Sequence, residues 1–132
     1  MTASPGATPG MRDSIRAALL NGPVQEPDGA VSFEFRFASS DRIFAGHFPA
    51  QPLVPGIFQT EMTRLAAESV LASTLDIREI VRAKFLRPIL PEETIRLSLK
   101  LSEEASIIQA RATLVAGGQT AGEAALKLCR SE

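Results

Sequence analysis

The sequence predicts an α+β domain in which one long helix packs against a curved antiparallel β-sheet. Five segments alternate apolar and polar residues with the period of a β-strand, whereas the segment that begins at Gly56 has helical periodicity. Four of the five alternating segments follow this helix and are separated only by short turns, which favours hairpin connections. A chain of 132 residues with 45% hydrophobic residues suits one domain. We assign residues 1–10, rich in Pro and Gly, to a flexible tail and residues 11–132 to the domain.

The predicted elements begin with a short helix and the clearest strand. Apolar residues recur at helical spacing over 11–20, and Asn21-Gly22 is typical of a helix end. After a turn at 27–29, residues 31–37 alternate aromatic and polar side chains, so one face of this strand is buried. The remaining predicted elements are the long helix over 56–73 and strands over 77–89, 94–101, 106–116 and 119–129.

Charge and composition exclude several classes of function. The formal net charge of −1 argues against nucleic acid as the main partner. The N-terminus lacks the basic and apolar regions of a signal peptide, and no run approaches the roughly 18 apolar residues that span a bilayer. Cys129 is the only cysteine, so an intrachain disulfide is excluded and a reducing compartment fits. We therefore expect a cytoplasmic protein without membrane contact.

The segment before the long helix has the strongest functional signal. It contains His47, the only histidine in the chain, followed by three prolines that stiffen the loop and prevent helix formation. Gly56 then allows close backbone approach where the helix begins, and Glu61 lies just over one turn into that helix. This grouping can bring a base, a helix N-terminus and an acid together at one site.

Two sequence blocks resemble the FabZ/FabA-type (3R)-hydroxyacyl-ACP dehydratases, which have the hot-dog fold. The blocks are Phe44-Ala45-Gly46-His47-Phe48-Pro49, followed by Pro52-Leu53-Val54-Pro55-Gly56-Ile57 and Glu61, and Lys84-Phe85-Leu86-Arg87-Pro88-Ile89-Leu90-Pro91. The resemblance implies a substrate on acyl carrier protein and a dimer in which the histidine and the acid come from opposite protomers. Because a sheet wrapped around one helix leaves an edge strand, a homodimer with one continuous sheet is expected. The resemblance also leaves open a hexamer, or a hetero-oligomer with another hot-dog protein.

The implied reaction assigns roles to individual residues. Loss of water from a 3-hydroxyacyl thioester needs a base at C2, and His47 titrates near neutrality. Glu61 is the expected acid at the C3 hydroxyl, in a protonated state that an apolar helix margin would favour. The backbone N–H groups of Gly56 or Ile57, at a helix N-terminus, suit the developing enolate oxygen. One histidine without a cysteine cluster offers no metal-ligand set, and we expect no cofactor.

Further residues are predicted to bind the substrate or its carrier. Phe48 and Phe85 are expected to line the substrate site. A basic cluster can receive an acidic carrier protein, because complementary charge speeds encounter and fixes orientation. The cluster consists of Arg78, Arg82, Lys84 and Arg87.

Departures from the family pattern leave other functions open. Ala50 stands where the family usually has Gly, and Leu65 stands where an amide is expected four residues after the acid, so another group must position Glu61. Residues 11–25 differ from the entry segment of housekeeping enzymes, which favours a specialised polyketide, aryl-polyene or lipid pathway.

The alternatives are a non-catalytic hot-dog subunit that supports an active partner, an acyl thioesterase, and a dehydratase that also isomerises the double bond. Purely structural roles also stay open for His47 and Gly56 in the loop, for Glu61 as a solvated acid like Glu68, for Phe48 and Phe85 in the core, and for the basic cluster as a solvated face.

Overall fold

The computed structural model describes residues 9–44 and 52–131. Within these ranges the chain forms two α-helices, one 3₁₀ helix and six strands. In chain order they are α1 (Pro9–Ala18), β1 (Leu19–Gln25), β2 (Val31–Arg36), the 3₁₀ helix Arg42–Phe44, α2 (Gly56–Leu71), β3 (Leu75–Phe85), β4 (Thr94–Glu104), β5 (Ile107–Ala116) and β6 (Gln119–Arg130). Most of the predicted tail, residues 1–8, lies outside the described residues, and Pro9 and Gly10 belong to α1.

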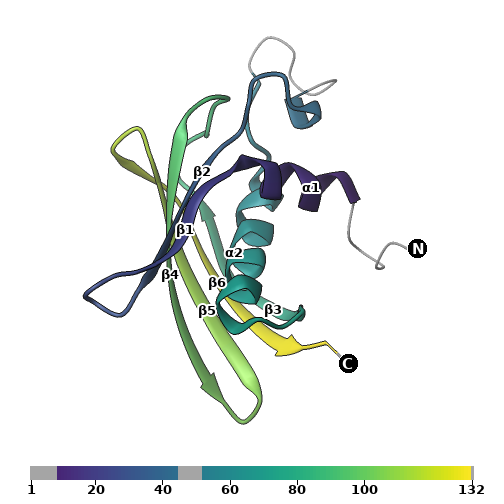
Figure 1. Cartoon of the computed structure of the whole chain (residues 1–132), viewed down its shortest axis with the longest axis vertical. Helices are drawn as coiled ribbons and strands as arrows, with labels where there is room; N and C mark the ends of the chain where they lie inside the picture. The colour runs from purple at the N-terminus through teal and green to yellow at the C-terminus, as the bar shows by residue number, and fades with distance from the viewer. Residues whose placement is uncertain (1–8, 45–51, 132) are drawn as a thin grey trace.

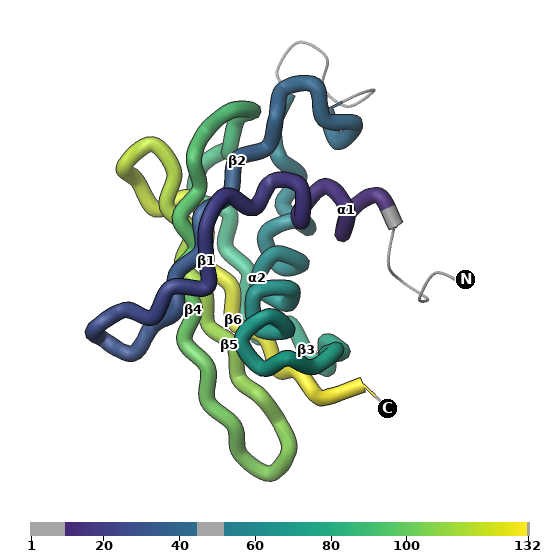
Figure 2. The backbone as a smooth tube through the Cα atoms, viewed as in Figure 1, coloured from purple at the N-terminus to yellow at the C-terminus, as the bar shows by residue number. Residues whose placement is uncertain are grey.

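The six strands form one sheet in the order β1-β2-β4-β5-β6-β3, and every neighbouring pair is antiparallel. Both helices lie on the same side of this sheet (Figure 1). The hairpin between β4 and β5 extends beyond the C-terminal end of α2 (Figure 2). These features confirm the predicted α+β class and the hairpins that join β4, β5 and β6. The predicted hairpin between β3 and β4 is wrong, because β3 pairs with β6 at the outer edge of the sheet. No helix among the described residues is long and apolar enough to cross a membrane.

The core lies between α2 and the sheet. Alternate residues of β4 and β5 are buried, as the period of a strand requires. On α2, Met62, Ala66 and Ala67 are almost completely buried, and the helix contacts β3, β4, β5 and β6. Small side chains at two of these three positions allow the close approach of helix and sheet that the sequence predicted. The core therefore fixes α2, and with it Glu61, relative to the strands.

The end of the first helix was predicted incorrectly. The helix was expected to continue through Leu20, but α1 ends at Ala18, and residues 19–25 form β1, paired with β2. The Asn21-Gly22 pair that suggested a helix end lies inside this strand, where the pairing register shifts. Gly22 has a φ of 117° and lies so close to Phe33 that a Cβ would be 2.8 Å from its ring. Glycine is required here because the strand kinks against its neighbour, not because a helix ends.

The alternation predicted for β3 is correct only in its second half. Directly opposite residues of an antiparallel pair point to the same face. Ala83 and Phe85 pair with Ala124 and Gly122, which are buried positions of β6, as predicted. Upstream, the register shifts between Ile77 and Glu79 and again between Ile80 and Arg82, which points to two bulges that interrupt the alternation.

Candidate active site

The N-terminal end of α2 lies beside the last residue of β3. The helix begins at Gly56, where the sequence placed it. The Phe85 ring covers this glycine so closely that a Cβ on residue 56 would be 2.8 Å from the ring. Close packing against the Phe85 ring, as well as the turn, therefore favours glycine at position 56. Gly56 and Phe85, two of the residues predicted to bind substrate, thus lie together. Phe85 is 55% exposed rather than buried in the core.

Among the residues that the structure describes, no side chain caps the first turn of α2. Pro55 precedes the helix in an extended conformation, with φ −60° and ψ 144°, and provides no side-chain cap. The first N–H groups of a helix have no acceptor within the helix, and the helix dipole is positive at this end. Ile57 is exposed here. The arrangement can therefore offer backbone N–H groups to a developing negative charge, as predicted for Gly56 and Ile57.

Glu61 lies on the flank of α2 in contact with two guanidinium groups. Arg64, three residues further along the same helix, donates to Oε1 of Glu61. Nε of Arg12, on α1, lies 3.8 Å from the same oxygen. The side chains of Glu61 and Arg64 are only 14% and 13% exposed. The sequence predicted apolar surroundings for this carboxyl, and this prediction is wrong. Helix α1 packs against α2 and brings Arg12 to the carboxyl.

Glu68 shares this flank and this arginine but has a structural partner. Nη1 of Arg12 donates to Oε1 of Glu68 at 3.5 Å, so one arginine spans both acids. The other carboxyl oxygen of Glu68 accepts a hydrogen bond of 2.7 Å from the backbone N–H of Leu75, the first residue of β3. The sequence suggested that Glu68 is a solvated acid, and this is wrong. It did not predict that Glu68 is largely buried and tied to the backbone.

The two arginines that contact Glu61 were missed by the sequence reasoning. Arg64 had a local signal, because residues three apart on a helix are neighbours and can form an ion pair. Arg12 had none, because it is distant from Glu61 in sequence and lies on another helix. These contacts show which groups hold the Glu61 carboxyl in this chain, where Leu65 offers no amide.

His47 and Phe48 lie outside the described residues, so their predicted roles stay predictions. The flanks of the segment that contains them are fixed in the core. Phe44 and Val54 are buried, and the backbone N–H of Val54 donates to the carbonyl oxygen of Ile89 at 2.8 Å. The residues on either side of this segment are therefore held at defined positions, and Val54 lies one residue before Pro55.

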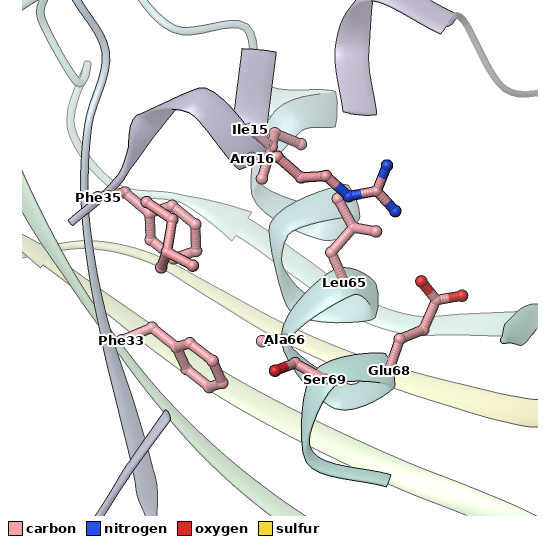
Figure 3. A pocket seen from close by; sticks show the side chains of 9 residues that line it. Ile15, Arg16, Phe33, Phe35, Leu65, Ala66, Glu68 and Ser69 are labelled. Carbon is pink, nitrogen blue, oxygen red and sulfur yellow. The ribbon is translucent and has the colours of Figure 1, made fainter. Parts of the chain in front are cut away.

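A cavity of about 300 Å³ lies between α1, β2 and α2. Its walls are mainly apolar, and Leu65 forms part of them. Figure 3 shows the lining side chains: the rings of Phe33 and Phe35 on one side, Leu65, Ala66 and Ser69 on the other, and Ile15, Arg16 and Glu68 around them. Leucine at position 65 thus lines an apolar space, whereas an amide there would add a polar group to it.

Three members of the predicted basic cluster are exposed, whereas the fourth, Arg87, is bonded to other parts of the chain. Arg78, Arg82 and Lys84 are exposed on β3, and Arg82 forms an ion pair of 3.4 Å with Glu123. Arg87 instead donates to Glu93 at 2.9 Å and to the carbonyl oxygen of Ala116 at 3.2 Å. The hydrogen bond from Arg87 lowers the pKa of Glu93 below its ordinary value. Arg87 thus ties two loops of the sheet together.

No group of three His, Cys, Asp or Glu residues within 9–44 and 52–131 is arranged to hold a metal ion. The chemistry that these residues offer is that of a carboxyl and of backbone N–H groups at the start of a helix. Both lie on α2, and the described chain supplies the arginines that hold the carboxyl.

Sequence comparison connects the chain to a family of dehydratases. A family model described as ApeI dehydratase (ApeI-like) matches residues 23–121. The 3-hydroxyacyl-acyl-carrier-protein dehydratase FabZ of Haemophilus influenzae is 29% identical over 96 residues, which cover 66% of this chain and 65% of that protein. The chain therefore spans slightly less than two thirds of the length of that curated relative. These findings confirm the resemblance carried by the two sequence blocks.

Two solved structures share the fold over most of both chains. The dehydratase heterocomplex ApeI:P from Xenorhabdus doucetiae superposes with a TM-score of 0.66 at 30% identity, and covers 83% of this chain and 93% of that one. An uncharacterized protein from Erwinia carotovora superposes with a TM-score of 0.68 at 29% identity, and covers 86% and 95%. The likeness thus extends over most of this chain in both comparisons.

Proposed function

Because this chain belongs to the ApeI-like dehydratase family, we propose that it removes water from a (3R)-hydroxyacyl thioester on acyl carrier protein. The product is the trans-2-enoyl thioester. The observation that carries the proposal is the Glu61 carboxyl fixed on α2, five residues after an uncapped helix start and fourteen after the only histidine. The FabZ relatives are named for this reaction, and FabZ is similar to this chain over 96 residues.

The proposed reaction uses three groups. His47 takes the proton from C2 of the substrate, and the negative charge that develops on the thioester oxygen is stabilised by the N–H of Gly56 or Ile57. Glu61 gives its proton to the C3 hydroxyl as the bond from C3 to oxygen breaks. Water leaves, and the electron pair from C2 forms the double bond between C2 and C3. Phe85, which covers Gly56, supplies an apolar wall for the acyl group next to the thioester.

The proposed assembly is a hot-dog homodimer in which α2 is the central helix and β3 pairs with β3 of a second copy. β3 is an outer strand of the sheet and is 11 residues long. Ile80, Val81 and Phe85 on this strand are about half exposed, which is unusual for a sheet edge unless another strand covers it. The opposite outer strand, β1, is shorter and is interrupted by two register shifts. β3 contains two register shifts as well, so the greater length of its edge is what favours β3.

The carrier protein is proposed to approach along β3. Arg82 and Lys84 pair with positions of β6 on the sheet face opposite Ala83 and Phe85, so their charges lie on the outer face of the strand that carries Phe85. Acyl carrier proteins are acidic, and complementary charge fixes orientation on approach. The departures at residues 11–25 and at Leu65 favour a specialised polyketide, aryl-polyene or lipid pathway over primary fatty-acid synthesis.

A second candidate is a hot-dog subunit that is active only with a partner. Two observations favour it. Leu65 replaces the amide expected near the acid, and the dehydratase structure from Xenorhabdus doucetiae is a heterocomplex. In this case the exposed edge of β3 would pair with a different hot-dog chain, and the partner would supply part of the catalytic machinery.

The test is to assay the purified full chain with a 3-hydroxyacyl thioester on acyl carrier protein, following enoyl product and free thiol separately. Enoyl product from the chain alone supports the leading proposal. Enoyl product only after addition of a second hot-dog protein would select the partner-dependent candidate, and release of free thiol would indicate a thioesterase. The His47→Ala variant should abolish dehydration while the fold, followed by circular dichroism, stays intact. Full activity in that variant would remove His47 from the mechanism.

A further inference from the structure

We infer that Arg12 on α1 and Arg64 on α2 are positioning residues that hold Glu61 ready to donate its proton. The inference rests on the proposed function, because it assumes that Glu61 is the acid. It assigns a catalytic purpose to α1, a helix whose sequence differs from the family's entry segment. It also names the groups that replace the missing amide at Leu65.

The geometry assigns different tasks to the two oxygens of the Glu61 carboxyl. Arg64 and Arg12 both approach Oε1, the first as a hydrogen-bond donor and the second at 3.8 Å. Among the described residues, no hydrogen bond reaches Oε2. A carboxyl held by one oxygen keeps its orientation, and the other oxygen can carry the proton that goes to the leaving hydroxyl. A general acid requires both a fixed orientation and an oxygen that can carry its proton.

Both arginines are themselves fixed by second contacts. Arg64 donates through Nη1 to the carbonyl oxygen of Leu75 at 3.4 Å, and Arg12 donates through Nη1 to Glu68 at 3.5 Å. Their side chains are 13% and 22% exposed, so neither is a mobile surface group. An exposed ion pair loses its worth to solvent screening and side-chain entropy. These two ion pairs are largely shielded from solvent. Arg64 is also bonded to the backbone of β3, and Arg12 is also bonded to a second acid, Glu68.

Two arginines and a second acid lie around Glu61. Arg12 faces it from α1, Arg64 faces it from its own helix, and Glu68 lies on the far side of Arg12. Leu75 at the start of β3 contributes its backbone carbonyl to Arg64 and its backbone N–H to Glu68. Removal of either arginine should therefore loosen the hold on the Glu61 carboxyl and misplace it relative to the leaving hydroxyl.

The experiment compares Arg12→Met and Arg64→Met with the unmodified chain in steady-state dehydration. Each variant should lower kcat by about tenfold or more, because a misplaced catalytic group costs on this scale. The KM should change little, since neither arginine is assigned to substrate binding. The Arg12→Lys variant keeps the charge but not the planar guanidinium, so it should restore only part of the rate.

Three controls separate the outcomes. Arg130→Met removes an arginine from an exposed ion pair with Glu103, and it should leave kcat and KM unchanged. Glu68→Gln weakens the contact between α1 and α2 without touching Glu61, so a loss of rate there equal to that of Arg12→Met would show that Arg12 serves only to dock α1 and would overturn the inference. Glu61→Gln tests the proposed function itself. If Glu61→Gln removes activity while both arginine variants keep full kcat, the inference fails alone. If Glu61→Gln keeps full rate, the acid assignment fails first and the inference falls with it.

Discussion

The two ends of α2 are built differently. At its C-terminal end, the backbone carbonyl of Glu68 accepts hydrogen bonds from the N–H groups of Ala72 and Ser73, and its carboxylate accepts one from Leu75. At its N-terminal end, Pro55 offers no side-chain cap and Gly56 lies under an exposed aromatic ring. One end is closed by bonds within the chain, whereas at the other end no described residue accepts a hydrogen bond from the N–H of Gly56 or Ile57.

This difference teaches how similar residues on one helix acquire different roles. Glu61 and Glu68 lie on one flank and both contact Arg12. The second partner separates them: Glu68 binds a backbone N–H that begins a strand, whereas Glu61 binds another side chain. A carboxylate committed to the backbone serves the fold, and a carboxyl held by side chains on one oxygen can serve chemistry.

Exchanging each acid for its amide should give the largest contrast between the two ends. Glu61→Gln should lower the dehydration rate by at least about a hundredfold, the scale of one general acid. Glu68→Gln keeps an acceptor oxygen for Leu75, so its rate should stay within about twofold. The measurement is kcat for both variants on one carrier-bound substrate. Equal losses in the two variants would show that the ends of α2 do not differ in function.

Stability should show the reverse contrast. Glu68→Ala leaves the N–H of Leu75, a completely buried residue, without its acceptor, which should lower the free energy of unfolding by about 1–3 kcal/mol. Glu79→Ala removes an exposed pair with Lys127 and should cost less than about 1 kcal/mol. Urea denaturation of both variants measures the difference. A cost for Glu68→Ala no greater than that of Glu79→Ala would contradict the structural role of Glu68.

The sequence predicted the C-terminal strands and α2 well because their patterns are local. Alternation is intrinsic to strands such as β4, and a Pro-Gly pair marks the start of α2 whatever surrounds it. The sequence failed at Leu19–Gln25, where pairing with β2 outweighed a local helix-end signal. It failed again at Glu61, because apolar neighbours along the helix said nothing about Arg12 arriving from another element. Tertiary contacts decided both cases.

The open end of α2 can be tested through Gly56 and Phe85. Gly56→Ala places a methyl group against the Phe85 ring, but this ring is half exposed and can turn aside. We expect a stability cost below about 1 kcal/mol, smaller than the 1–3 kcal/mol typical of overpacking in a closed core. Dehydration should fall several-fold, because the displaced ring no longer lines the site. A double-mutant cycle with Phe85→Ala measures the coupling between the two positions. Complete additivity of the two changes would show that the ring and the helix start act independently.

The smallest expected effect concerns the charges beside this open end. Lys84 precedes Phe85 and is exposed, so kcat/KM for carrier-bound substrate should fall several-fold as salt shortens the screening length from about 10 Å at 0.1 M towards 3 Å at 1 M. The same acyl group on a small neutral thiol should show no such fall. Lys84→Met should reduce both the rate with carrier and its salt dependence, whereas Arg130→Met, in an exposed pair with Glu103, should change neither. An identical salt response with both substrates would remove β3 as the carrier's approach and leave Lys84 as a solvated charge.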